Sequence, residues 1–98
     1  MGIDMYFSDR AINFYTSVYT NKIRNVRLSG ASYELRRLHG ISLRELLDIS
    51  YNSHFIATRE MLNNLRAIQA EVDDTELDAA IEMLQYSYDN QIQVTWSE

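Results

Sequence analysis

Apolar residues recur at three- and four-residue steps through most of the chain, and this spacing constrains the fold more than any other feature. One run covers residues 11–26, and a shorter run follows over residues 32–39. A third run begins at Leu43 and continues to about residue 71, and a fourth begins at Thr75. Because one face of an α-helix returns about every 3.6 residues, each run predicts an amphipathic helix.

Local residues indicate where these helices begin and end. We expect Gly30 to end the first helix and Gly40 the second, since Gly adopts the left-handed conformation that follows many helices. Ser42 and Glu45 match a capping box, in which two side chains satisfy free amides at a helix start. The segment 52–54 (Asn-Ser-His) lies inside the third run and predicts a bend or an interruption there.

The two ends of the chain show a different pattern, in which apolar and polar residues alternate. The apolar members are Ile3, Met5 and Phe7 at the start and Ile92, Val94 and Trp96 at the end. Alternation with period two is typical of half-buried strands, and frayed helix ends are the competing interpretation. We expect a mainly α fold, a small bundle of about four helices in one domain over residues 1–98. If the terminal segments are strands, we expect them to pair as a short two-stranded antiparallel ribbon.

Composition limits the class of protein. The 98 residues are 46% hydrophobic and include no Cys, which excludes a disordered tail, a disulfide scaffold and a thiolate metal site. The sequence has no apolar run of about 18 residues and no secretory leader, so we expect no membrane contact and a cytoplasmic location. Chains this short commonly extend their buried surface by self-association, and we therefore expect a homo-oligomer.

Residue patterns typical of catalysis or cofactor binding are missing. His39 and His54 are 15 residues apart and match no metal-ligand spacing. The three glycines stand alone at positions 2, 30 and 40, so no phosphate-binding loop is present. We expect no enzymatic activity, no cofactor and no metal.

Charge is distributed unevenly along the chain, whose net charge is −5. Residues 1–66 hold all nine basic residues and six acidic ones, whereas residues 67–98 hold eight acidic residues and no basic one. This asymmetry indicates an electrostatic partner, unless the two halves pair with each other inside the molecule. Both alternatives remain open at the level of the sequence.

Acidic residues concentrate at the start of the last expected helix. Carboxylates spaced along a helix can imitate a phosphate backbone and occupy a basic groove. We therefore expect a small acidic protein-binding module, of the kind that phages and bacteria use as inhibitors or anti-defence proteins, acting on a basic surface of a protein partner. A solvated helix face is the simpler interpretation. The candidate protein-binding residues are Glu71, Asp73, Asp74, Glu76, Asp78 and Glu82.

Arginines and one tyrosine form the alternative candidate site. A guanidinium group grips carboxylate or phosphate in two parallel hydrogen bonds, and a tyrosine ring can stack on a base. The expected ligand is a nucleotide or another small anion, and not duplex nucleic acid, because the chain is acidic overall. Stabilisation of a helix C-terminus by these cations is the simpler explanation. The candidate ligand-binding residues are Arg24, Arg27, Tyr33, Arg36 and Arg37.

Two short segments resemble known families. Residues 34–50 (ELRRLHGISLRELLDIS) resemble the opening of a phage-repressor helix-turn-helix, but residues 48–52 depart from its second turn. Residues 28–30 (Leu-Ser-Gly), in an acidic chain without Cys, are similar to the WXG/LXG helical-hairpin partners of type VII secretion, whose first helices are longer. Secretion as such a helical partner is a third functional hypothesis, and the chain is assigned to neither family.

Overall fold

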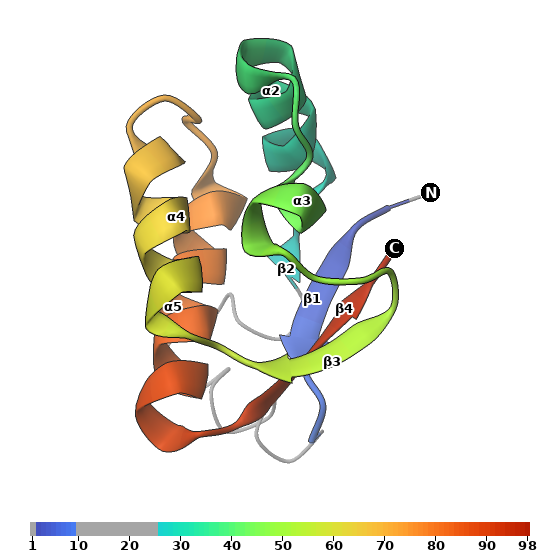
Figure 1. Cartoon of the computed structure of the whole chain (residues 1–98), viewed down its shortest axis with the longest axis vertical. Helices are drawn as coiled ribbons and strands as arrows, with labels where there is room; N and C mark the ends of the chain where they lie inside the picture. Colours follow the sequence, from blue (N-terminus) through green and yellow to red (C-terminus); the bar gives the residue numbers. More distant parts are fainter. Residues whose placement is uncertain (1, 10–25) are drawn as a thin grey trace.

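The computed structural model describes residues 2–9 and 26–98, and in these residues four helices and four strands form one layered unit (Figure 1). The helices stand above and beside the strands in Figure 1. In chain order the elements are β1 (Asp4–Phe7), β2 (Val26–Arg27), α2 (Ser29–His39), α3 (Leu43–Leu47), β3 (Ser53–Ile56), α4 (Arg59–Gln69), α5 (Thr75–Asn90) and β4 (Gln93–Ser97).

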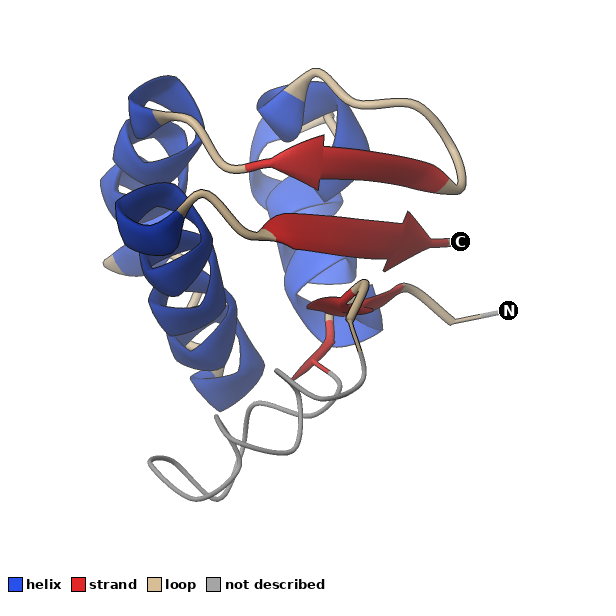
Figure 2. Ribbon diagram, turned by 90° about the horizontal axis from the view of Figure 1, so that it is seen from below, coloured by secondary structure: helices blue, strands red, loops and turns tan. Residues whose placement is uncertain are grey.

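The four strands form an antiparallel sheet with the order β2-β1-β4-β3 (Figure 2). The central pair is β1 with β4, in which Met5 lies opposite Trp96 and Phe7 opposite Val94. All four of these side chains are fully buried. They form the sheet's contribution to the core, because side chains alternate between the two faces of a strand.

Helices α4 and α5 pack against each other and supply the other half of the core. Leu62 and Leu65 of α4 are buried, and so are Leu77, Ile81 and Leu84 of α5. These are positions of the expected apolar stripes, and the start of α5 at Thr75 confirms the predicted start of the last helix. No helix in the described part of the chain combines the length and the apolar character that crossing a membrane requires.

The predicted mainly helical bundle with a two-stranded ribbon is wrong. The terminal segments do pair, but they form the centre of a four-stranded sheet, with β2 and β3 added at either side. Both extra strands are short; β3 and the first residue of β2 fall inside runs with helical spacing. Pairing with an existing strand satisfies their backbone groups, and this outweighs the weak local preference of so few residues.

The helix expected from Leu43 to about residue 71 is wrong as one continuous element, whereas the interruption expected at residues 52–54 is confirmed. Asp48 and Asn52 adopt left-handed backbone conformations, with φ of 54° and 50°, and strand β3 follows them. Asp and Asn tolerate this conformation better than other non-glycine residues. Helix α4 then starts anew, with the Thr58 hydroxyl accepting a hydrogen bond from the Met61 amide at 3.2 Å.

The predicted helix ends are partly confirmed. Gly40 ends α2 in a left-handed conformation (φ 74°), and the Ser42 hydroxyl caps α3 by accepting from the Glu45 amide at 3.2 Å. Gly30 does not end a helix, because it lies in the first turn of α2. Of the first expected helix, residues 11–25 lie outside the described residues, and Val26 belongs to β2.

The sheet also bears on the two resemblances. Helix α3 has only five residues and is followed by β3, where a helix-turn-helix would place the remainder of its recognition helix. A helical hairpin, as the WXG/LXG resemblance implies, contains no four-stranded sheet.

Replacing Gly40 tests the left-handed end of α2. No other group lies within 4 Å of a Cβ placed there, so the cost of Gly40→Ala is purely conformational. We expect this variant to lose about 1 kcal/mol of unfolding free energy in urea denaturation. Gly40→Asn, which tolerates positive φ, should retain most of the stability, and equal losses in both variants would contradict this explanation.

Candidate functional site

The six acidic candidate residues do not form one free helix face. Glu76, Asp78 and Glu82 lie on α5, and the other three precede it. The Asp74 carboxylate caps α5 by accepting from the Glu76 amide at 2.8 Å. Glu71 forms an ion pair and hydrogen bond with His39 when that histidine is protonated. Through these contacts, two of the acidic residues stabilise the fold of the chain itself.

Two further carboxylates of the group have partners within the molecule. The Arg27 amide donates to Glu76 at 3.3 Å, and the Gln69 side chain donates to Asp78 at 2.8 Å. Asp73 and Glu82 are exposed, and neither has a hydrogen bond or ion pair within the described residues. Contacts within the molecule therefore engage four of the six carboxylates, but in the described residues only Glu71 faces a cationic side chain, so pairing of this group with the arginines is not seen.

The basic candidate residues are not assembled into one cluster. Arg27 pairs with Asp4 at 3.4 Å, and Arg37 pairs with Glu34 at 2.8 Å one helical turn away. The hydrogen bond from Arg37 lowers the pKa of the Glu34 carboxyl below its ordinary value. Arg36 is exposed and forms no ion pair within the described residues. Arg24 lies outside the described residues.

Arg36 and Tyr33 line a groove of about 440 Å³ that runs along α2, and we call it the Tyr/Arg groove. Its other wall is formed by Tyr51, which precedes β3, and by Glu98, which follows β4. The two tyrosines are 69% and 61% exposed, which is high for residues of this size. The complete lining is Ile3, Ser29, Ser32, Tyr33, Arg36, Ser42, Tyr51 and Glu98.

Serine hydroxyls hold the elements around the groove together. Ser29, in the first turn of α2, accepts a hydrogen bond from the Ile3 amide at 2.9 Å. The buried Ser32 accepts one from the Leu43 amide at 3.3 Å and so joins α2 to the start of α3. The groove therefore has a fixed frame that connects the start of the chain, α2 and α3.

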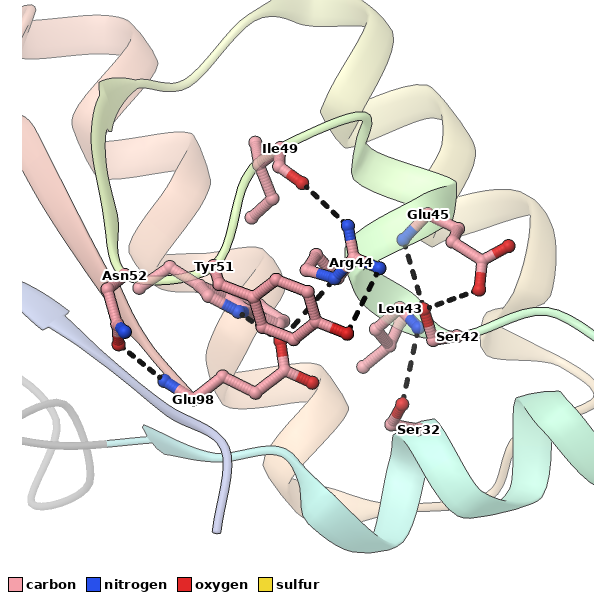
Figure 3. A network of polar contacts seen from close by, with 10 residues as sticks. Ser32, Ser42, Leu43, Arg44, Glu45, Ile49, Tyr51, Asn52 and Glu98 are labelled. Carbon is pink, nitrogen blue, oxygen red and sulfur yellow. Dashed lines mark hydrogen bonds and ion pairs between the residues drawn. The ribbon is translucent and has the colours of Figure 1, made fainter. Parts of the chain in front are cut away.

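Arg44 fixes the second wall of the groove (Figure 3). Its guanidinium group lies 4.0 Å from the centre of the Tyr51 ring, a cation–π contact, and also donates to the Tyr51 hydroxyl at 3.4 Å and to the Ile49 carbonyl at 3.3 Å. Its Nε is buried without a hydrogen bond and faces the Glu98 carboxylate at 3.7 Å. The Asn52 side chain accepts from the Glu98 amide at 3.1 Å. Tyr51 and Glu98 are thereby anchored to one another.

Another polar network lies outside the groove and crosses three strands. The Thr95 hydroxyl, on β4, is within hydrogen-bond distance of Ser8 after β1 (2.7 Å) and of His54 on β3 (2.8 Å). This chain of contacts ties the strands together on the sheet face opposite Trp96. In the described residues no group of three or more histidine, cysteine or acidic side chains is arranged to hold a metal ion.

Sequence reasoning identified Tyr33 and Arg36 but missed Tyr51, Arg44 and Glu98. Tyr51 lies in the run of helical spacing that begins at Leu43, which predicts a helix where the structure has none, and Glu98 carries no local signal. Only the folding of the chain brings Tyr51 and Glu98 to the groove beside α2, with Arg44 in contact with both. Comparisons with protein-family models, with curated proteins and with solved structures found no match.

Removing the Arg44 charge should loosen the second wall of the groove. Arg44→Met keeps much of the side-chain volume but removes three polar contacts and leaves Glu98 without its cation. We expect a loss of about 2 kcal/mol in the free energy of unfolding, measured by chemical denaturation. The matched variant Arg37→Met removes an exposed pair and should leave stability unchanged within error. Equal effects of the two substitutions would contradict the anchoring role.

Proposed function

We propose that the protein is a non-enzymatic binding protein that takes a small anion with a planar ring, such as a mononucleotide, in the Tyr/Arg groove. The single observation that carries this proposal is the placement of Arg36, which forms no ion pair with residues 2–9 or 26–98, in a groove flanked by two exposed tyrosine rings. Its volume of about 440 Å³ lies within the range of about 300–1,000 Å³ found for small-ligand sites.

Two other arginines near the groove already have partners, which supports Arg36 as the anion-binding group. Arg37 is paired with Glu34, and Arg44 is committed to Tyr51, Ile49 and Glu98. Arg36 has no such partner among the described residues, and its guanidinium group can offer two parallel hydrogen bonds to a phosphate or carboxylate.

Two features favour a ring-bearing ligand of limited size. An exposed tyrosine ring presents an apolar face on which a planar group can stack, and stacking on aromatic side chains contributes about 1–3 kcal/mol per base. The net charge of −5 opposes the long-range approach of a polyanion such as duplex DNA, whereas a mononucleotide carries few charges.

Neighbouring arginines on α2 allow a matched test. Calorimetric titration with the adenosine, guanosine, cytidine and uridine monophosphates should reveal binding, and the unphosphorylated nucleosides should bind more weakly. Arg36→Gln should weaken nucleotide binding about tenfold or more, since it removes a charge-assisted contact. Arg37→Gln removes the same charge one residue away, outside the groove, and should leave the affinity unchanged. A panel without any binding, or equal losses in both variants, would exclude this function.

The acidic segment supports a second candidate function, binding to a basic surface of a protein partner. The observation in its favour is that Asp73 and Glu82 are exposed without partners in the described residues. Their positions next to Asp74 and on α5 place them within the acidic stretch 71–82. This candidate includes the inhibitor role expected from the charge pattern.

Charge reversal tests this second candidate with a short polylysine peptide as the probe. Binding should weaken steeply with added salt. The double variant Asp73→Lys with Glu82→Lys should reduce the affinity more than Glu60→Lys with Asp89→Lys, which alters the charge equally outside the segment. The same loss in both double variants would show a response to net charge alone and would reject a specific acidic site.

A further inference from the structure

Strand β3 is an outer strand of the sheet in the described residues. It pairs with β4 on one side, with Ser53 opposite Trp96 and Phe55 opposite Val94, and no other described strand pairs with it. An unpaired strand edge presents backbone N–H and C=O groups that can accept a further strand. The edge of β3 is therefore a surface with defined hydrogen-bonding geometry.

The direction of each backbone group along β3 follows from the neighbouring strands. The Ser8 amide donates to the Gln93 carbonyl at 3.1 Å, so the backbone groups of Gln93 point toward β1. Because these directions alternate along a strand, those of Val94 and Trp96 point toward β3. Ser53 and Phe55, which lie opposite them, use their backbone groups in that ladder. His54 and Ile56 consequently present their N–H and C=O groups outward.

Strand β3 lacks the features that usually protect an edge. Exposed edges commonly carry a lysine, a proline or another charged residue that hinders pairing. The four residues of β3 are Ser, His, Phe and Ile, with no Lys, Pro or acidic residue. Ile56 is 41% exposed, so an apolar side chain accompanies the open backbone groups.

We propose that a second copy of this chain pairs antiparallel with β3 and extends the sheet across a two-fold axis. The register follows from which β3 residues are in extended conformation and present unpaired backbone groups. Asn52 leaves the strand with φ of 50°, so His54 and Ile56 are the two open positions. In one antiparallel register, His54 of each chain lies opposite Ile56 of the other. Only this register lets the backbone groups of both residues form hydrogen bonds in both chains. It places the two copies of Phe55 opposite each other at the two-fold axis.

The open positions of β3 are self-complementary in the antiparallel register, and the edge carries no carboxylate that would repel a second copy. Two chains with a net charge of −5 repel each other least where the contact carries no carboxylate, and β3 has none. The acidic connection between α4 and α5 lies near the top of the view in Figure 1, whereas β3 crosses its lower half. Pairing through β3 therefore joins uncharged edges and keeps the two acidic segments apart.

Sedimentation equilibrium over a range of protein concentrations tests the self-association. The wild-type chain should form a dimer, and Ile56→Lys should raise the dimer dissociation constant about tenfold or more, because it places a charge at the edge. Leu38→Lys is the matched control, since Leu38 is similarly exposed (43%) but lies on α2. A wild-type chain that stays monomeric at every concentration, or an equal effect of both lysine variants, would overturn the proposal.

A crosslinking experiment tests the register separately. The chain has no cysteine, so Phe55→Cys introduces a single thiol. Under mild oxidation this variant should form a disulfide-linked dimer, because the proposed axis brings the two positions together. Tyr6→Cys on the central strand β1 should remain monomeric under the same conditions. A failure of Phe55→Cys to crosslink while the wild-type chain dimerises would reject this register, and crosslinking of both variants alike would reject pairing through β3.

Discussion

The antiparallel pairing of β1 with β4 is the constraint on which the described structure depends. It joins two segments from opposite ends of the chain and buries Met5, Phe7, Val94 and Trp96 between the sheet and the helices. Strands β2 and β3 are too short to persist alone, and each pairs with one member of this central pair. The same pairing carries the two ends of the chain to the Tyr/Arg groove, where Ile3 and Glu98 contribute to its lining.

A second consequence of the sheet is the path of residues 48–56. The chain leaves α3 through left-handed Asp48, turns at left-handed Asn52 and enters β3 beside β4. This path exposes Tyr51 at the groove and gives Arg44 three polar partners that a continuous helix would not supply. The edge of β3 and the second wall of the groove therefore arise from one local feature of the backbone.

Contacts inside the described part of the molecule engage many of its charged groups, four times as an ion pair. Most of the acidic segment caps α5 or accepts hydrogen bonds from neighbouring elements, and several arginines have carboxylate partners. Exposed pairs of this kind contribute little stability individually. Among the charged groups that form no ion pair with another described residue, Arg36 is distinguished by its place in a groove between two aromatic rings.

The sequence by itself determined the features that depend on neighbouring residues: the left-handed Gly40, the Ser42 cap, the start of α5 at Thr75 and the two terminal strands, with alternating burial in β1. It also singled out Tyr33 and Arg36. Only the tertiary structure decided that residues 53–56 form a strand, that most of the acidic segment accepts hydrogen bonds within the molecule, and that Tyr51 and Glu98 lie across the groove from α2. The physical reason is that strand pairing and side-chain contacts join residues far apart in the chain, where local spacing holds no information about which partners will meet.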